Sequence, residues 1–334
     1  MTFLISYLFD INITKLTWIA LVKLIIIYKS GLLKLKRLFT NIKLPHLGSL
    51  WMLVAALGFA IMGALVKVGS AKFSSAELVF YRSAFGLLAI CVFIFAKKLP
   101  LKTRVIGKHM SRSIVGFASL VLFFYAIAHL PLATAITLNY TSPLFLALLM
   151  PYMLQKEHQQ QAVKKWLYGA VVLGFVGVML LLQPTLQAGD ALAGALGLAS
   201  GLGAAIAYIH IKQLSNVFEP DWRTVFYFTL VSTIGSGAWL LLQNFTAVLW
   251  QDLPLLIGLG VSATIAQMAL TRAYRTGNTL VVASLAYVTV VLASLFGVFF
   301  WQEQLSTAEW MAIGLIILSG IIGVFATHAR VKKN

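Results

Sequence analysis

Residues 131–143 read Pro-Leu-Ala-Thr-Ala-Ile-Thr-Leu-Asn-Tyr-Thr-Ser-Pro, and they open a long apolar run. The run ends at Gln155-Lys-Glu157, and Trp166-Leu-Tyr-Gly169 follows nine residues after the glutamate. A Gly-x-x-Gly pair at Gly174 and Gly177 closes the series. A fixed order of landmarks like this one can be searched for elsewhere in the same chain, where its return would reveal a repeat.

The same order returns in the second half of the chain. Gly277-Asn-Thr-Leu-Val opens an apolar run that passes Tyr287 and ends at Trp301-Gln-Glu303. Trp310-Met-Ala-Ile-Gly314 and a second Gly-x-x-Gly pair then follow. The two halves therefore read as two copies of one structural unit.

The composition indicates an integral membrane protein. Of the 334 residues, 60% are hydrophobic and 10% are charged, whereas a soluble domain carries nearer a quarter charged residues. Unpaired backbone amides in lipid cost several kcal/mol each, and the apolar stretches lack the alternation of a barrel, so we expect an all-α fold. Ten stretches are long enough to cross about 30 Å of hydrocarbon: 48–66, 77–96, 111–129, 131–151, 166–183, 190–210, 223–243, 253–271, 278–299 and 306–326.

The basic residues predict the orientation of these spans. With the N-terminus in the cytoplasm, all but Lys67, Lys72 and Arg82 of the 26 Lys and Arg residues fall in cytoplasmic segments. This asymmetry follows the positive-inside rule and places both termini in the cytoplasm, in a cell membrane that we expect to be a bacterial inner membrane. It also accounts for the net charge of +17 without a nucleic-acid partner.

The offset between the repeats predicts their relative orientation. Five expected spans separate Glu157 from Glu303, and an odd number of spans turns the second copy upside down. Secondary transporters use inverted repeats of this kind to place a substrate site near the middle of the membrane. We therefore expect ten transmembrane helices, arranged as two inverted five-helix repeats.

The domain boundaries follow from these spans. We assign residues 48–183 to the first repeat, 190–326 to the second, and 327–334 to a basic cytoplasmic tail. Residues 1–47 form a basic extension whose apolar run is short and contains Lys23. This run favours an interfacial amphipathic segment over an eleventh span, and the extension could also be dispensable.

The chain resembles the EamA-type transporters of the drug/metabolite transporter superfamily over about residues 48–326. The resemblance rests on Arg82, on the Asn139–Pro143 stretch, and on the signatures Glu157…Trp166…Gly169 and Glu303…Trp310…Gly314. It implies a ten-helix carrier with two EamA repeats for small, amino-acid-like metabolites, exported more often than imported. Two departures indicate that the halves have diverged: Thr289 stands where Pro143 would align, and the seventh span lacks a counterpart of Arg82.

Five residues are candidates for substrate binding. Arg82 lies a turn or so inside the outer end of its expected span, where it could hold a carboxylate or phosphate, snorkel to the interface, or pair with Glu77. Asn139 and Tyr140 precede Pro143, and this proline could open a binding cavity or a packed kink. Gln267 and Tyr287 are weaker candidates of the same kind.

These features favour a secondary transporter working by alternating access, as an exporter or an exchanger. The alternatives are a membrane-embedded enzyme, for which the short loops leave no catalytic domain, and a channel-like facilitator. No catalytic residue, metal site or cofactor is predicted, because neither Gly-x-x-x-x-Gly-Lys nor His-Glu-x-x-His occurs. The expected partners are a small-molecule substrate and the lipid bilayer; the substrate's identity, the coupling and the oligomeric state are left open.

Overall fold

A computed structural model describes residues 47–130, 132–154, 165–183, 191–241, 245–302 and 304–328, and these residues contain helices and connecting turns but no strand. The N-terminal segment, Glu157 and Glu303 lie outside the described residues. The elements of the first repeat are α2 (Leu47–Gly69), α3 (Ser75–Ala96), α4 (Ile106–His129), α5 (Leu132–Asn139), α6 (Ser142–Met153) and α8 (Lys165–Leu182). Those of the second repeat are α9 (Ala191–Ser215), α10 (Asp221–Leu240), η1 (Trp250–Asp252), α11 (Leu253–Thr276), α12 (Thr279–Ala286), α13 (Val288–Trp301) and α14 (Thr307–His328).

Eight segments of the described chain are long and apolar enough to cross a membrane, so this is a multi-pass membrane protein. They are Gly48–Gly69, Ser75–Ala96, Ile106–Ala126, Lys165–Leu182, Ala191–Ser215, Trp250–Thr276, Thr279–Trp301 and Thr307–Phe325. The two other expected spans, 131–151 and 223–243, fall on α5–α6 and on α10, which are not among the eight. The all-helical prediction is confirmed, and the count of ten stays a proposal.

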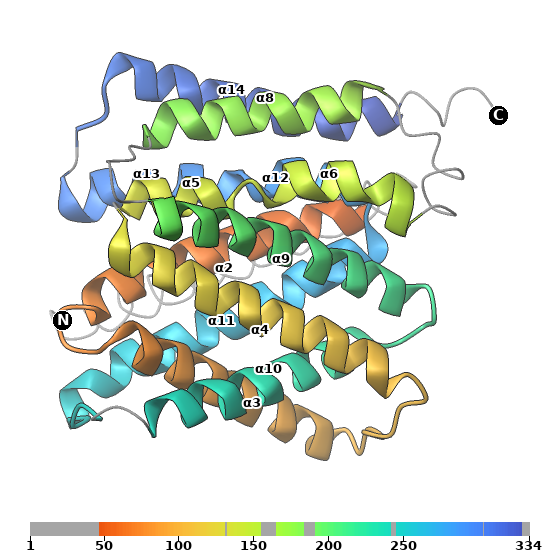
Figure 1. Cartoon of the computed structure of the whole chain (residues 1–334), viewed down its shortest axis with the longest axis vertical. Helices are drawn as coiled ribbons and strands as arrows, with labels where there is room; N and C mark the ends of the chain where they lie inside the picture. The colour runs from red at the N-terminus through yellow and green to blue at the C-terminus, as the bar shows by residue number, and fades with distance from the viewer. Residues whose placement is uncertain are drawn as a thin grey trace, which may run out of the picture. The chain divides into compact units, whose positions relative to one another are not determined.

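Corresponding helices of the two repeats pack in corresponding ways. The first helix of each repeat lies along the third helix of the other, so α2 packs on α11 and α9 packs on α4. The second helices, α3 and α10, pack on each other, and so do the last helices, α8 and α14. Figure 1 shows α8 beside α14 at one edge and α3 beside α10 at the opposite edge. This exchange of partners is what a two-fold relation between two copies produces.

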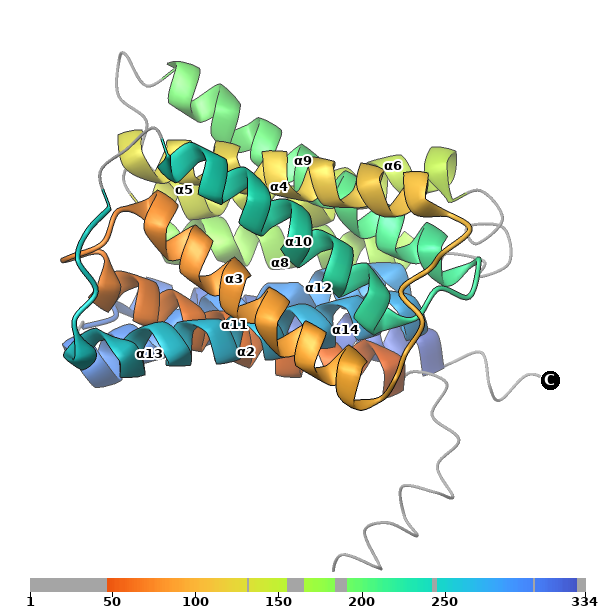
Figure 2. The same ribbon diagram turned by 90° about the horizontal axis from the view of Figure 1, so that it is seen from below.

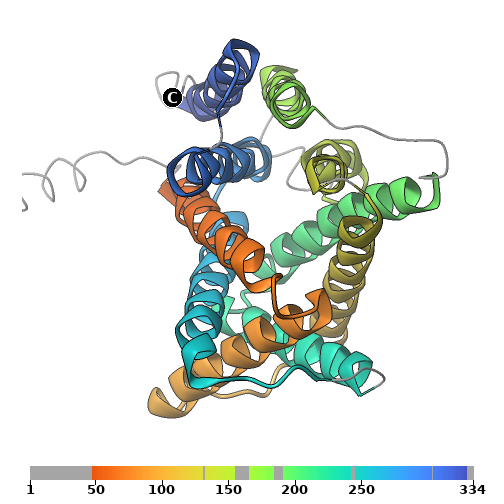
Figure 3. The same cartoon turned by 90° about the vertical axis from the view of Figure 1, so that its left-hand side faces the viewer.

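Small residues let the paired helices approach closely. A Cβ atom on Gly177 of α8 would lie 2.7 Å from the Ile316 side chain of α14. One further contact between these helices is a hydrogen bond that the Ser319 hydroxyl donates to the Ala170 carbonyl at 2.8 Å. Figure 3, which looks along the bundle, shows α8 and α14 side by side. Close packing through glycine and serine is typical of helices in lipid, where apolar burial alone gives little drive for association.

The fourth span of the first repeat is broken, not merely kinked. α5 ends at Asn139, and α6 begins at Ser142 with Pro143 in its first turn. Pro143 has no N–H to offer the Asn139 carbonyl four residues earlier, so the helical ladder stops there. The Thr141 hydroxyl donates to the Leu138 carbonyl at 2.6 Å and satisfies one of the acceptors at this end.

The second repeat is broken at the matching place. α12 ends at Ala286 and α13 begins at Val288, with Tyr287 between them. No proline accounts for this break, since Thr289 stands where the first repeat has Pro143. Figure 1 shows α5, α6, α12 and α13 in one layer below α8 and α14. The two repeats therefore share a broken helix although only one of them carries the proline.

Candidate substrate-binding site

The two helix breaks bring a pair of tyrosines together. The ring centroids of Tyr140 and Tyr287 are 6.4 Å apart. Tyr287 is fully buried, and its hydroxyl has no hydrogen-bond partner among the described residues. Gly174 of α8 makes room for this ring, because a Cβ atom there would lie 2.4 Å from it. Two of the five candidate residues thus meet at the breaks, one from each repeat.

Asn139 attaches the first break to α9. Its side-chain amide donates to the Ser200 hydroxyl at 3.0 Å, and that hydroxyl donates to the Gly197 carbonyl at 2.6 Å. The Ser119 hydroxyl of α4 donates to the Ser200 carbonyl at 2.7 Å. The Asn139 side chain therefore has a structural partner in place.

Gln267 has a buried side-chain amide nitrogen without a hydrogen-bond partner among the described residues. It lies on α11 with 7% of its surface exposed. A buried polar group left without a hydrogen bond costs about 1–3 kcal/mol. A water molecule or a polar substrate would remove this cost. No described contact joins Gln267 to the tyrosine pair.

Arg82 is half-buried on α3 and makes no hydrogen bond or ion pair with any residue that the structure describes. Gly86, one turn further along α3, faces Thr229 of α10 and Thr264 of α11, so this side of α3 faces those helices. The alternative in which Arg82 pairs with Glu77 is wrong. The Glu77 carboxylate instead accepts hydrogen bonds from the backbone N–H groups of Ser74, at 2.7 Å, and Thr246, at 2.6 Å.

Arg112 is the main residue that the sequence analysis misplaced. The positive-inside pattern places it with the cytoplasmic cations, at the very end of the expected span 111–129, but it lies in the second turn of α4 with only 3% of its surface exposed. Its guanidinium carbon lies 4.0 Å from the centroid of the Phe228 ring on α10. A second missed feature is the stacked pair of Tyr208 and Tyr274, whose ring centroids are 4.8 Å apart.

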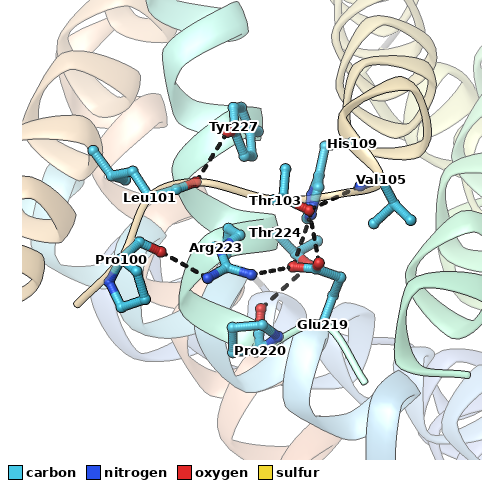
Figure 4. Close-up of polar contacts among 10 residues, drawn as sticks. All are labelled: Pro100, Leu101, Thr103, Val105, His109, Glu219, Pro220, Arg223, Thr224 and Tyr227. Carbon is cyan, nitrogen blue, oxygen red and sulfur yellow. Dashed lines mark hydrogen bonds and ion pairs between the residues drawn. The ribbon is translucent and has the colours of Figure 1, made fainter. Parts of the chain in front are cut away.

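A polar network joins the repeats near the start of α4 and α10 (Figure 4). The Glu219 carboxylate accepts hydrogen bonds from Thr103 and Arg223 at 2.7 Å each and contacts His109 Nε2 at 3.2 Å. Arg223 also donates to the Pro100 carbonyl at 2.6 Å. Figure 2 views the molecule from the α3–α10 side, where the segment before α4 runs past α10. The network therefore ties the α3–α4 connection and α4 to α10.

Comparison with known proteins identifies the family. The sequence matches the EamA-like transporter family over residues 46–183 and again over residues 191–325. The chain belongs to this family. It therefore has two EamA repeats and lies within the drug/metabolite transporter superfamily, as the landmark residues predicted.

Relatives of this EamA protein are transporters of small molecules. The pseudopaline exporter CntI of Pseudomonas aeruginosa strain UCBPP-PA14 is 32% identical over 86% of this chain and 97% of the exporter. A riboflavin transporter of Vibrio cholerae is 26% identical over 87% of this chain and 96% of its own. An S-adenosylmethionine uptake transporter of Rickettsia felis is 23% identical over 76% of this chain and 84% of its own. The protein is thus a membrane transporter, and the enzyme alternative is wrong.

A solved crystal structure shares the fold of this EamA chain. It superimposes with a TM-score of 0.72 over 85% of this chain and 99% of the other, at 17% sequence identity. At this identity the likeness concerns the fold alone.

The Glu219 network gives the EamA protein a pH-dependent contact. Burial alone would raise the pKa of the Glu219 carboxyl, but hydrogen bonds from Thr103, Arg223 and His109 lower it below its usual range. A carboxyl whose pKa is lowered by folding stabilises the fold above its unfolded pKa of about 4.3, and this stabilisation is lost as the pH falls through the folded pKa.

We expect Glu219→Gln to lower the melting temperature at pH 7, because it removes a charge from partners that stay buried, at a cost of about 1–3 kcal/mol. The difference from the wild type should shrink as the pH falls from about 5 towards 3, where Glu219 is itself neutral. Melting curves in detergent at several pH values measure it. Glu309→Gln is the control, since glutamine also fits the capping box that Glu309 forms with Ser306. A difference that does not change with pH would contradict the ionic role of Glu219.

Proposed function

We propose that this protein exports a small, polar, amino-acid-like metabolite by alternating access, with ten spans arranged as two inverted repeats of five. The observation that best supports this proposal is the pair of broken helices. The breaks lie at matching places of the two repeats and bring Tyr140 and Tyr287 together. Secondary transporters bind substrates at such discontinuous helices near the middle of the membrane. The relatives include both an exporter and an uptake transporter, and the proposed direction follows the exporter because it is the more similar of the two.

In this proposal the substrate lies near the breaks. Tyr140, Tyr287 and the unused amide of Gln267 offer it aromatic and polar contacts, and Arg82 binds an anionic group such as a carboxylate. Asn139 contacts the substrate at the edge of the break while its amide bonds Ser200. The relatives are named for chemically different solutes, so the family alone does not select among substrates.

The test is flux into liposomes that contain the purified protein. Thermal shift against a panel of amino acids and related metabolites selects candidate solutes, and counterflow then measures their transport. Saturable counterflow with trans-stimulation is expected of a carrier. A non-saturable flux without trans-stimulation would favour the channel-like alternative and overturn alternating access.

The ten-span topology predicts which positions face the cytoplasm. In a Cys91→Ala background, single cysteines at 185–189 and 302–308 should react with an impermeant reagent from outside the cell. Cysteines at 100–107 and 330–334 should stay protected until the membrane is opened, because positive-inside segments remain cytoplasmic. External labelling at residue 334 would refute an even number of spans with both ends in the cytoplasm of a bacterial inner membrane.

We further propose that residues 1–47 are a peripheral, dispensable extension. In this proposal they lie on the membrane surface and do not cross the membrane. Deleting residues 1–44 should leave the remaining chain inserted and folded, at lower abundance at most. The measurement is labelling of the same cysteine positions in the truncated protein. Reversed labelling or failed insertion would show that the extension contains a true span.

A further inference from the structure

Arg112 carries a buried charge for which the described protein supplies no counter-ion. Its side chain is 3% exposed, and its Nε and Nη1 atoms have no hydrogen-bond partner among the described residues. The guanidinium carbon lies over the face of the Phe228 ring, 4.0 Å from its centroid. A cation on an aromatic face keeps its edge N–H groups available to an anion.

The carboxylates that the structure describes are all engaged elsewhere. Glu219 and Asp221 could have neutralised Arg112, but Glu219 holds His109 and Arg223, and Asp221 pairs with Arg272 and Arg275 at 3.0 and 3.1 Å. Three described carboxylates remain. Glu77 accepts hydrogen bonds from Ser74 and Thr246, Asp252 pairs with Lys72, and Glu309 accepts a hydrogen bond from Ser306. Within the described chain, no anion is left for Arg112.

The sequence makes room for this guanidinium. A Cβ atom at Gly116, one turn after Arg112, would lie 2.7 Å from Arg112 Nη1 and 3.2 Å from the Phe228 ring. A glycine here therefore allows the long side chain to lie along α4 and over Phe228. Burying a charge without a partner is energetically costly. A buried charged side chain that lacks a protein partner is therefore typical of a binding site, where a ligand of opposite charge offsets this cost.

The surroundings of Arg112 suit an amphipathic anion. Its charge lies within electrostatic reach of His109, His210 and Tyr208. Tyr208 stacks on Tyr274, and both rings offer apolar surface with a polar edge. His109, one turn before Arg112 on the same helix, is held by Glu219 in the network of Figure 4. Under the proposed topology, this network lies on the cytoplasmic side of Arg112.

We infer that Arg112 binds the carboxylate of the substrate in the cytoplasmic half of the bundle, before the substrate reaches the broken helices. This inference rests on the proposed function and adds to it a required anionic group and a first binding position. Arg82 lies near the outer start of α3 and Arg112 near the inner start of α4, so a carboxylate crossing the membrane would meet one arginine in each half.

The test compares each carboxylate with its neutral amide. Binding of L-amino acids and of their carboxamides, such as L-methionine and L-methioninamide, is measured by calorimetry on the full-length protein in uncharged detergent, which removes lipid phosphate as a competing anion. We expect the wild type to bind at least one amino acid about tenfold more tightly than its amide. Arg112→Gln should show a clearly smaller preference, because only Arg82 then remains to bind the carboxylate, and Arg112→Lys should recover part of the difference.

The controls separate binding from folding. Arg104→Gln changes an exposed arginine of the α3–α4 connection and should keep the wild-type preference. Without ligand, Arg112→Gln should melt no lower than the wild type, because it loses an uncompensated charge; a lower melting temperature would indicate a structural cation–π contact instead. If Arg112→Gln does not fold, a reduced preference in folded Arg112→Lys decides in favour of the proposal.

Besides a lowered melting temperature of Arg112→Gln, two binding results would overturn the inference. One is an unchanged carboxylate preference in Arg112→Gln or, where that variant does not fold, in Arg112→Lys; the other is a wild type that prefers no carboxylate over its amide. Neither result bears on saturable counterflow by the wild type, which tests the proposed carrier function separately. If the protein showed saturable flux only of solutes without a carboxylate, the proposed carrier function would stand and the proposed anion site at Arg112 would be wrong.

Discussion

Gly201→Leu should destabilise the folded protein by at least about 1–3 kcal/mol, the usual cost of overpacking a core. A Cβ atom at Gly201 would lie 2.3 Å from the Thr141 hydroxyl, 2.8 Å from the Leu138 carbonyl and 3.1 Å from the Asn139 carbonyl. Two of these atoms belong to the backbone at the first helix break, so they cannot rotate away. The break would have to separate from α9, and the Asn139–Ser200 hydrogen bond would be lost with it.

The measurement is thermal unfolding in detergent, followed by tryptophan fluorescence, together with flux per folded molecule. Gly201→Ala should show the same direction with a smaller effect. Gly169→Ala is the matched control, because nothing lies within 4 Å of a Cβ atom there; alanine should stabilise that helix by up to about 1 kcal/mol. Equal melting temperatures for Gly201→Leu and the wild type would show that the break does not depend on close packing against α9.

Local hydropathy was enough to predict most of the helices. The expected span 77–96 became α3 (Ser75–Ala96), and 253–271 became α11 (Leu253–Thr276), because the length of an apolar run directly reflects the thickness of the hydrocarbon. The repeat was also visible, since its landmarks occur in the same order in both halves. These features depend on residues that are neighbours in the sequence.

The features that sequence analysis missed depend on distant contacts. The span placed at 111–129 begins at Ile106, so Arg112 belongs inside the helix and not at its end. Its burial depends on Phe228 in the other repeat and on the space left by Gly116. Gly116 was a readable signal one turn away, but Phe228 could not be assigned to Arg112 without the fold.

The candidate site shows the same division. Tyr140 could be chosen because it precedes Pro143 within its span, and Tyr287 is a weaker candidate as an aromatic residue with a hydroxyl inside an apolar run. Their meeting could not be derived, since it depends on how the two repeats pack. The partner of Glu77 is similarly remote: Thr246 precedes α11 in the second repeat, so sequence spacing suggested only Arg82.

Arg82→Ala should reduce transport of an anionic substrate about 100-fold while the protein stays folded. Truncating one partner of a desolvated charge pair costs about 2–5 kcal/mol, and each 1.4 kcal/mol is a factor of ten. Arg82 has no described partner whose loss would disturb the fold, so the substrate carboxylate is the group that would be left without a partner. Arg82→Lys should recover part of the flux, because an ammonium keeps the charge and loses the planar fork.

Initial rates of counterflow and melting temperatures, measured on both variants with a solute that the wild type transports, distinguish the three roles of Arg82. An anchor loses flux and keeps its melting temperature. A snorkelling arginine transports normally in both variants. A structural cation melts at a lower temperature, as Glu77→Gln should, because Glu77 joins the start of α3 to Thr246. Glu77→Gln is thus the matched control for damage to α3, and normal flux in Arg82→Ala would end the anchor hypothesis.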